Sequence, residues 1–515
     1  MISINSTSKK TAAIFSYVYL ALNSVMSILL APILLKYLGV DEYGLYQMVY
    51  SMGHYILILD LGIGTVMVRY IAEYRAKEDC VGMREFAGMI AILTLIICLI
   101  VICVGLVVNS NLENIFTNLK SEDYVKSHTM FNLMIYQFVV TIIDNYIQGC
   151  ISAYERFVFT KIFGIFKVCV VFTLTILFVY LGFGAVGILM ANALVITGLA
   201  IINIIYAFKS LHFRIRLTRW KAVVMMPVWG LMIAMLLQSI VANVNSTVDK
   251  TILGIMCTPA DVAVYSIAAS IITLFNMVPT VISGFFQPQV TRMVVKGTNG
   301  AELTDLVVRV GRWQFVLCSA FLAGLVLLGQ DFMNLWVGGH LSSEEMRFSL
   351  LIILLILPFN MVPLVQTICV SILNAYDKRM SRSLILMAIC VLNIIFTVVA
   401  IGLWGPIGSP LGTALSYFIG YVVILNIYYS RSLHLEVSRM FKEIFSRLWI
   451  CVVVSTLLCL PLCLWHMHSW MSFIVKGILF SLVLFILLYF KGFNAEEKGI
   501  VNSYLYKFSI IKNRD

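Results

Sequence analysis

Long apolar runs, separated by short polar segments, follow one another along the whole chain. A run of about 20 apolar residues is long enough to cross a bilayer as a helix, and fourteen runs meet this length. Their predicted bounds are 11–35, 45–72, 86–109, 127–152, 161–181, 185–208, 224–256, 262–290, 312–330, 347–374, 383–403, 407–430, 447–465 and 472–490. The pattern predicts an all-α, polytopic membrane protein with about 14 transmembrane helices.

The composition strengthens this prediction and limits the meaning of the charge. Of 515 residues, 61% are hydrophobic and 12% are charged, and the mean hydropathy is +0.97. The net charge of +11 would suit an acidic partner, but thirty of the 36 basic residues lie in segments assigned to one side of the membrane. The positive-inside rule predicts such a distribution. We therefore expect both termini in the cytoplasm and no nucleic-acid partner.

Metal and nucleotide chemistry find little support in the residues. The 12 cysteines are scattered and no Cys-x-x-Cys pair occurs, so we expect no metal site and no cofactor. No Gly-rich Lys-Ser/Thr loop for nucleotide phosphates occurs either. The energy source is therefore expected to be a coupling ion (H+ or Na+), the membrane potential or the substrate's own gradient.

Short motifs recur at a nearly constant distance. Ala153–Arg156 matches Ala375–Lys378, and Gly184–Gly187 matches Gly405–Gly408, at equivalent places in the predicted topology. Each repeat contains six helices, an even number, so we expect two parallel repeats related by an axis along the membrane normal. The predicted domains are an N-lobe with helices 1–6, a C-lobe with helices 7–12, and helices 13–14 with a cytoplasmic tail, over residues 1–222, 223–436 and 437–515.

The stretch Gly230–Gly254 begins as an apolar helix and becomes polar halfway along. At helical spacing it carries two neighbouring polar rows. The first row is Gln238, Asn245 and Asp249, and the second is Ser239, Asn243, Ser246 and Lys250. Polar groups in hydrocarbon are costly unless they are paired or hydrated, so we interpret this helix as facing a water-filled cavity. Hydrogen bonding to neighbouring helices is the alternative.

Other predicted helices add polar residues to the lining of this expected cavity. They are Asn23 in helix one, Asp60 in helix two, Asp144 in helix four, and Asn276 and Gln287 in helix eight. The candidates for holding an anionic headgroup are four bases: Arg69, Lys167, Lys250 and Arg292. Two alternatives remain open. Asp60 or Asp144 neutralises a nearby base in a structural ion pair, or the bases contact anionic lipids outside the bundle.

Several of these segments resemble the polysaccharide flippases. The runs that carry the likeness are LLKYLGVDEYGLYQ (Leu34–Gln47), LDLGIGTVMVRYIAEY (Leu59–Tyr74), VDKTILG (Val248–Gly254) and AVYSIA (Ala263–Ala268). These flippases are the O-antigen and exopolysaccharide repeat-unit translocases of the multidrug/oligosaccharidyl-lipid/polysaccharide (MOP) exporter superfamily. The likeness extends over essentially the whole chain, including predicted helices 13 and 14.

The resemblance implies a two-lobed bundle around a cationic cavity lined mainly by helices one, two, seven and eight. It implies a flippase that carries a prenyl-diphosphate-linked oligosaccharide from the inner to the outer leaflet by rocking of the lobes. The implied location is the cytoplasmic (inner) membrane of a bacterium. The implied partners are the lipid-linked oligosaccharide, membrane lipids and polysaccharide assembly proteins.

Three other functions are weighed against this one. A cation-coupled multidrug antiporter of the same superfamily commonly has twelve helices and an acid in helix one, whereas Thr11–Leu35 contains no Asp or Glu. A membrane polymerase or ligase, the enzymatic alternative, typically has a large outer loop, which this sequence lacks. A peptidoglycan-precursor flippase is the nearest alternative. We therefore expect a transporter and no enzyme activity.

Overall fold

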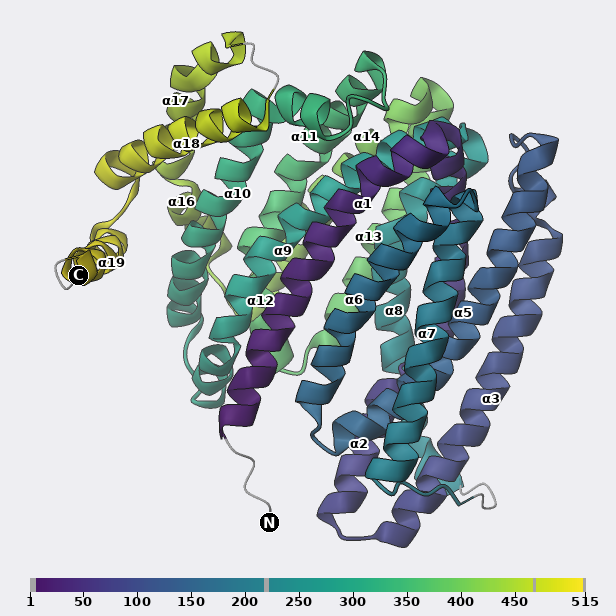
Figure 1. Ribbon diagram of the computed structural model, residues 1–515. Helices are drawn as coiled ribbons and strands as arrows, with labels where there is room; N and C mark the ends of the chain where they lie inside the picture. The colour runs from purple at the N-terminus through teal and green to yellow at the C-terminus, as the bar shows by residue number, and fades with distance from the viewer. Residues whose placement is uncertain (1–5, 217–221, 466–468, 513–515) are drawn as a thin grey trace. The chain divides into compact units, whose positions relative to one another are not determined.

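The computed structural model describes residues 6–216, 222–465 and 469–512, and every regular element within these ranges is helical. Figure 1 shows the order of the helices along the chain. The chain is a multi-pass membrane protein, since twelve helical stretches of the described residues are long and apolar enough to cross a bilayer. The prediction of an all-α, polytopic membrane protein is confirmed.

The count of fourteen helices is close to the number of stretches but is not confirmed by it. Two stretches, Val18–Ala76 and Met380–Leu433, contain 59 and 54 residues. A straight helix of 59 residues would be about 90 Å long, roughly three times the hydrocarbon thickness. Each long stretch contains a glycine in the left-handed region, Gly39 with φ 75° and Gly405 with φ 68°. Each long stretch therefore contains two of the predicted helices, which meet at the turn.

The chain packs as two compact units. The first unit consists of Met1–Ser270 and Cys390–Gly412, and the second of Ile271–Ile389 and Thr413–Asp515. The predicted domains, 1–222, 223–436 and 437–515, were defined by the sequence repeat, whereas these units are defined by how the helices pack. They stay a prediction, as does the axis that relates the repeats.

The first unit is built mainly from long helices. They are α1 (Ser6–His54), α2 (Ile63–Ala76), α3 (Cys80–Ser110), α4 (Leu112–Ile115), α5 (Ser121–Ala153), α6 (Phe157–Tyr180), α7 (Gly184–Ile205) and α8 (Ala222–Met256), with short helices at Tyr55–Asp60 and Tyr206–Ser210. Residues 259–270 of α9 (Pro259–Val295) and 390–404 of α13 (Arg379–Trp404) also belong to this unit, as do Gly405–Ile407 and the start of α14 (Gly408–Tyr417). Helices α5, α6 and α7 pack side by side, and α1 packs against α6 (Figure 1).

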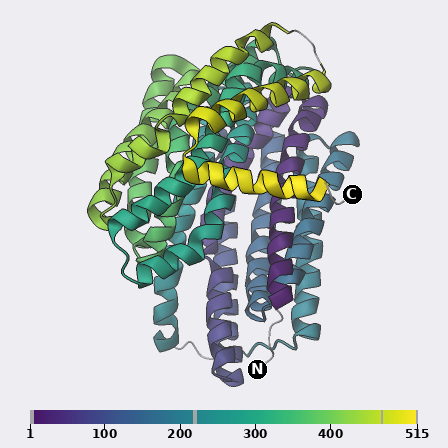
Figure 2. The same ribbon diagram turned by 90° about the vertical axis from the view of Figure 1, so that its left-hand side faces the viewer.

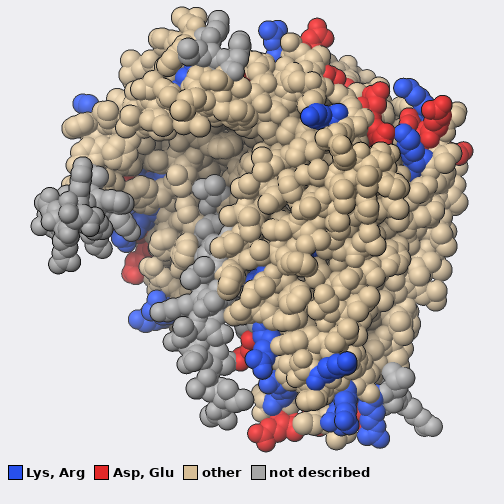
Figure 3. Space-filling view, in the orientation of Figure 1, with Lys and Arg blue, Asp and Glu red and all other residues tan. Residues whose placement is uncertain are grey.

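Close backbone contact holds α2 against α5. A Cβ atom added at Gly149 of α5 would lie 2.7 Å from the carbonyl oxygen of Gly64 in α2. Only glycine permits this approach, so substitution at Gly149 would separate the two helices. Outside these contacts, α3 exposes large apolar side chains such as Leu95, Leu99 and Val107. The face over α3, α5, α6 and α7 in Figure 3 is mostly uncharged between charged ends, as expected for a surface in contact with lipid.

The second unit surrounds α10 (Gly300–Trp336), which contacts α11, α12, α16, α17 and α18. The other elements that lie entirely within it are α11 (Ser343–Val365), α12 (Thr367–Ala375), α15 (Leu425–Leu433), α16 (Val437–Phe445), α17 (Leu448–Cys459), α18 (Trp470–Leu487) and α19 (Ala495–Lys512), with short helices at Phe418–Ile424, Leu460–Leu464 and Leu488–Gly492. Figure 2 shows α17, α18 and α19 from another side. Lys476 of α18 is buried and pairs with Asp331 of α10 at 2.6 Å, which fixes α18 on α10.

Candidate functional site

The two polar rows of α8 have different surroundings. In the first row, Asp249 accepts hydrogen bonds from the Tyr265 hydroxyl of α9 at 2.8 Å and from Oγ1 of Thr397 in α13 at 3.4 Å. Asn245 of the same row accepts from Sγ of Cys390 in α13 at 3.4 Å. This part of the row therefore joins α8 to neighbouring helices, as the hydrogen-bonding alternative expects. Gln238 at the start of the row is exposed.

The second row of α8 bonds mainly to its own backbone. Nδ2 of Asn243 donates to the Ser239 carbonyl at 2.9 Å, and the Ser246 hydroxyl donates to the Asn243 carbonyl at 3.0 Å. Asn243 is half-buried and Ser246 is exposed. These short side chains make no cross-helix bond among the described residues. This row is the accessible one of the two.

Lys250 ends the accessible row and reaches α1. Its Nζ donates to Oε1 of Gln47 at 3.1 Å, and Nε2 of Gln47 donates to the Tyr43 hydroxyl at 3.0 Å. Among the described residues Lys250 forms no ion pair, and its side chain is half-buried. A charged side chain within a membrane helix is costly to insert unless it is paired or hydrated. The ammonium therefore needs water or an anion as a further partner.

A second polar region is a cavity of about 480 Å³ inside the first unit. It is lined by residues of α1, α5, α6 and α7: Tyr19, Asp144, Asn145, Gln148, Ser152, Thr160, Lys161, Phe163, Gly164, Lys167, Ile196, Leu199 and Asn203. Asp144 is buried and accepts from Nδ2 of Asn203 at 2.7 Å and from Nε2 of Gln148 at 2.6 Å. Lys167 lines the same cavity, but no ion pair within 4 Å joins it to Asp144 among the described residues. The cavity therefore contains a carboxylate that is well bonded and a base that is not.

Asp60 lies at a break in the second membrane helix. The short helix Tyr55–Asp60 is separated from α2 by Leu61 and Gly62, both in the left-handed region with φ 52° and 68°. A Cβ atom at Gly62 would lie 2.8 Å from Cβ of Met235, so glycine allows α8 to approach the break. Oδ2 of Asp60 accepts from Nδ2 of Asn145 at 3.3 Å, while Oδ1 is buried and has no hydrogen-bond partner. A half-buried carboxylate at a helix break, with one oxygen bonded and the other unbonded, is typical of functional positions in transporters.

The four predicted headgroup bases are placed in different surroundings. Arg69, Lys167 and Lys250 belong to the first unit, and Arg292 of α9 belongs to the second. Arg69 and Arg292 have exposed side chains, and the Arg69 guanidinium lies 5.8 Å from the centre of the Tyr70 ring. Among the described residues neither Arg69 nor Lys167 is ion-paired with Asp60 or Asp144. In the part of the chain that the structure describes, Asp60 and Asp144 therefore make no direct ion pair with these two bases.

The remaining predicted lining residues are less informative. Asn23 and Gln287 are exposed, and Asn276 accepts a hydrogen bond from Nδ2 of Asn360 at 2.6 Å within the second unit. No group of three or more His, Cys, Asp or Glu side chains that could hold a metal lies within the described ranges. The oxygen-rich cluster of Asp249 and Thr397 in the first unit has the ligand type that hard cations prefer, with one carboxylate only.

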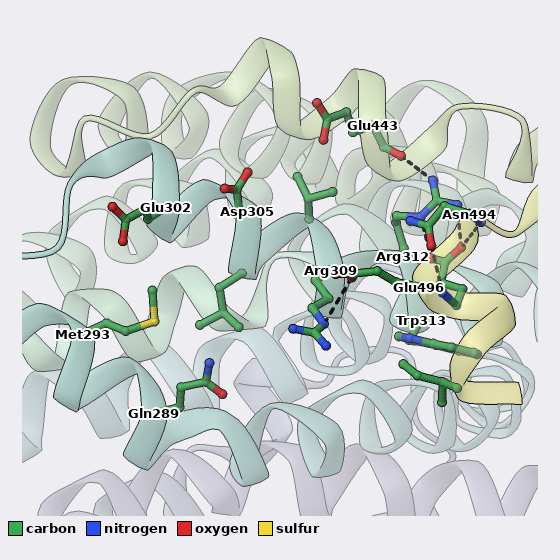
Figure 4. A pocket seen from close by; sticks show the side chains of 14 residues that line it. Gln289, Met293, Glu302, Asp305, Arg309, Arg312, Trp313, Glu443, Asn494 and Glu496 are labelled. Atoms are coloured by element: carbon green, nitrogen blue, oxygen red, sulfur yellow. Dashed lines mark hydrogen bonds and ion pairs between the residues drawn. The ribbon is translucent and has the colours of Figure 1, made fainter. Parts of the chain in front are cut away.

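A cavity of about 470 Å³ in the second unit has charged walls that bind one another. Arg312 is buried and donates through Nε and Nη2 to the two carboxylate oxygens of Glu497, at 2.6 and 2.9 Å. Its Nη1 donates to the Glu443 carbonyl of α16 at 2.7 Å (Figure 4). Nearby, Nε of Arg309 lies 3.7 Å from Glu496. These contacts clamp the start of α19 to α10 and α16, so we assign this cavity a structural role.

Several residues of the candidate site were missed in the sequence. Gln47, Asn145 and Asn203 bond to the polar residues that were predicted, but each partner comes from another helix. Asn145 directly follows Asp144, and Asn203 is an amide in an otherwise apolar run, which are the only signals that the sequence offers for them. The pairings themselves depend on how the helices pack.

Comparison with known proteins identifies the family. Residues 9–293, more than half of the chain, match the family described as "Polysaccharide biosynthesis protein". The chain belongs to this family. The fold and the predicted resemblance agree with this assignment.

A relative with a named activity matches part of this chain. The probable flippase AglR of Haloferax volcanii is 29% identical over 182 residues, which are 35% of this chain and 37% of the relative. The match therefore spans about a third of the curated relative.

Solved structures of transporters share the fold. The lipid II flippase MurJ in an inward closed conformation has a TM-score of 0.70 at 13% identity, over 92% of this chain and 97% of MurJ. An inward-facing multidrug resistance MATE family transporter of the MOP superfamily has a TM-score of 0.64 at 13% identity, over 83% of this chain and 99% of that transporter. At these identities the likeness concerns the fold alone, which the chain shares with MurJ and with this transporter of the MOP superfamily.

Proposed function

We propose that this protein is a flippase that moves a prenyl-diphosphate-linked oligosaccharide, such as an O-antigen or other polysaccharide repeat unit, from the inner to the outer leaflet by alternating access. The observation that carries the proposal is Lys250, a half-buried ammonium in a membrane helix whose hydrogen-bond partner is the neutral Gln47 side chain. The family and the flippase relative support the same function.

The electrostatic argument starts from the cargo. A diphosphate that leaves water for an apolar bilayer loses its hydration, and this loss is prohibitive unless protein charges replace it. A base that is already neutralised by an acid would contribute little to such a site. Lys250 and Lys167 carry charges that no ion pair offsets among the described residues, and Arg69 and Arg292 are exposed. We infer that Arg69, Lys167 and Lys250 of the first unit hold the anionic headgroup, while Arg292, which belongs to the second unit, stays a prediction from the sequence.

The location and topology belong to the proposal. We place the protein in the cytoplasmic membrane of a bacterium with both termini inside, because thirty of the 36 basic residues fall on one predicted side. Membrane lipids surround the helices, and polysaccharide assembly proteins are proposed partners. A multidrug antiporter driven by a cation is the second candidate function, and the unpartnered Oδ1 of Asp60 is the observation that favours it.

The proposal is tested in a host strain that lacks this gene. Surface polysaccharide should be lost, and lipid-linked repeat units should accumulate on the inside. Expression of wild-type protein should restore export. At equal protein level, Lys250→Gln should restore less than about a tenth of it, because loss of this charge should weaken binding of the headgroup by more than about 1.4 kcal/mol. Lys120→Gln is the matched control, since Lys120 is 82% exposed and lies 4.0 Å from Asp41. Normal polysaccharide together with a new drug sensitivity would favour the antiporter.

A further inference from the structure

Three rings lie in a row along the second half of α1. Tyr46 and Tyr50 have ring centres 5.6 Å apart with planes tilted by 33°, and Tyr50 and His54 have ring centres 4.5 Å apart with planes tilted by 41°. The positions are i, i+4 and i+8, so the rings follow one face of the helix over about 12 Å. We call Tyr46, Tyr50 and His54 the aromatic row.

The aromatic row lies at the edge of the buried face of α1. Leu45, Met48 and Val49, on the other side of the same helix, are at most 1% exposed. The three rings are half-buried, and so are Gln47 and Lys250 beside them. Nδ1 of His54 is buried and has no hydrogen-bond partner. Packing of the helix therefore leaves part of the surface of these three residues accessible.

A cation lies beside the rings. Lys250 is held by Gln47, which is one residue from Tyr46 and three from Tyr50 on α1. The arrangement combines one cation, an amide and a row of flat apolar surfaces with polar edges. A complementary ligand has an anionic group directly joined to rings that present C–H groups on their faces and hydroxyls at their edges.

We propose that the aromatic row is a binding subsite for the sugar rings of the cargo nearest to its diphosphate, with Lys250 beside the diphosphate. The inference rests on the proposed function and deepens it. The C–H faces of pyranose rings pack on aromatic rings, and the hydroxyls bond to polar groups such as the tyrosine hydroxyls. Stacking depends little on the identity of the sugar, so the row recognises the presence of a glycan and leaves its composition open.

Direct binding tests the subsite without relying on transport. The purified protein in lipid nanodiscs is titrated by calorimetry with two probes: a short-chain prenyl diphosphate, and the same lipid bearing a linear tetrasaccharide of N-acetylglucosamine. Wild-type protein should bind the glycosylated probe more tightly. The Tyr46→Leu/Tyr50→Leu double variant should lose about tenfold in affinity for that probe, since each ring contact is worth a few-fold. Its affinity for the bare prenyl diphosphate should change less than about twofold.

Two further variants separate stacking from folding. Tyr50→Phe keeps the ring and removes only the hydroxyl, so it should lose less affinity for the glycosylated probe than the double variant does. Tyr37→Leu removes an exposed tyrosine of α1 that contacts Tyr180 edge-on at 6.1 Å, and it should leave both affinities unchanged. Equal losses for both probes in the double variant, or no loss for the glycosylated one, would overturn the subsite. If wild-type protein binds the glycosylated probe through the row but does not move it in vesicles, the subsite stands and the proposed function fails.

Discussion

Nζ of Lys250 donates a hydrogen bond to Oε1 of Gln47 at 3.1 Å, across 203 residues of sequence. The contact ties α8 to α1 without neutralising the lysine, because an amide oxygen carries no net charge. A carboxylate at position 47 would have formed an internal ion pair and left no charge for a ligand. The neutral partner positions the ammonium and keeps it available.

The clamp between Arg312 and Glu497 should dominate the stability of the second unit. Both side chains are buried, and the bidentate contact has distances of 2.6 and 2.9 Å. Glu497→Ala leaves a buried guanidinium unpaired, so we expect the free energy of unfolding to fall by about 3–5 kcal/mol. Glu496→Ala is the matched control, because this exposed residue lies 3.7 Å from Arg309 and should cost at most about 1 kcal/mol. Thermal unfolding in detergent measures both, and equal losses would contradict the account.

Asp60 and Arg69 should be energetically independent. The Asp60 carboxylate bonds to Asn145, and the exposed Arg69 guanidinium lies over the Tyr70 ring. In a double-mutant cycle with Asp60→Asn and Arg69→Gln, we expect a coupling free energy below about 0.5 kcal/mol. Stability of the four proteins is read from thermal unfolding. A coupling above about 1.5 kcal/mol would instead establish the structural ion pair that the sequence left open.

In the cavity of the first unit, loss of the acid should lower stability, whereas loss of the base should lower export. Asp144→Leu leaves the amides of Asn203 and Gln148 without their acceptor, so we expect a loss of about 1–3 kcal/mol for each amide. Lys167→Met removes a charge that no ion pair holds among the described residues. It should leave stability within about 0.5 kcal/mol and lower polysaccharide export. A strongly destabilised Lys167→Met protein with normal specific export would show that Lys167 serves packing.

The topology is open to test by thiol labelling in intact cells. Cys80, exposed at the start of α3, is predicted to be cytoplasmic, and Cys257, between α8 and α9, is predicted to face outward. In variants that retain a single cysteine, an impermeant maleimide should label Cys257 from outside and Cys80 only after permeabilisation. Burial, with a smaller effect of the Asp261 charge, raises the pKa of the Cys257 thiol to about 11. The thiolate is therefore scarce at neutral pH, and labelling should accelerate about tenfold per pH unit between pH 7 and 9. Labelling of Cys80 in sealed cells would show that the orientation is opposite to the predicted one.

The apolar runs were predictable because a membrane span must satisfy its backbone internally and must be long enough to cross. The breaks near Gly39 and Gly405 were predictable too, because predicted helices 11–35 and 45–72 lie on either side of the first, and 383–403 and 407–430 on either side of the second. The polar rows of α8 were also visible at helical spacing. Which row bonds to neighbours and which stays accessible depended on Tyr265, Cys390 and Thr397, whose helices meet α8 only in the folded chain.

The partners of the predicted site residues could not be read from the sequence for the same reason. Gln47 is 203 residues from Lys250, and Asn145 is 85 residues from Asp60. The aromatic row shows the opposite difficulty, because Tyr46, Tyr50 and His54 at i, i+4 and i+8 are spaced like the buried face of any helix. Only their partial exposure in the folded unit separates these three residues from core residues.

Translocation of a defined lipid by the purified protein is the most direct test of the proposed flippase. Proteoliposomes would carry a fluorescent prenyl-diphosphate oligosaccharide, and a membrane-impermeant quencher would report how much of it lies in the outer leaflet over time. The account predicts that wild-type protein exchanges the lipid between leaflets, that Lys250→Gln slows this exchange about tenfold or more, and that Lys120→Gln does not. Exchange at the rate of protein-free vesicles by well-folded wild-type protein, under an imposed H+ or Na+ gradient as well as without one, would contradict it.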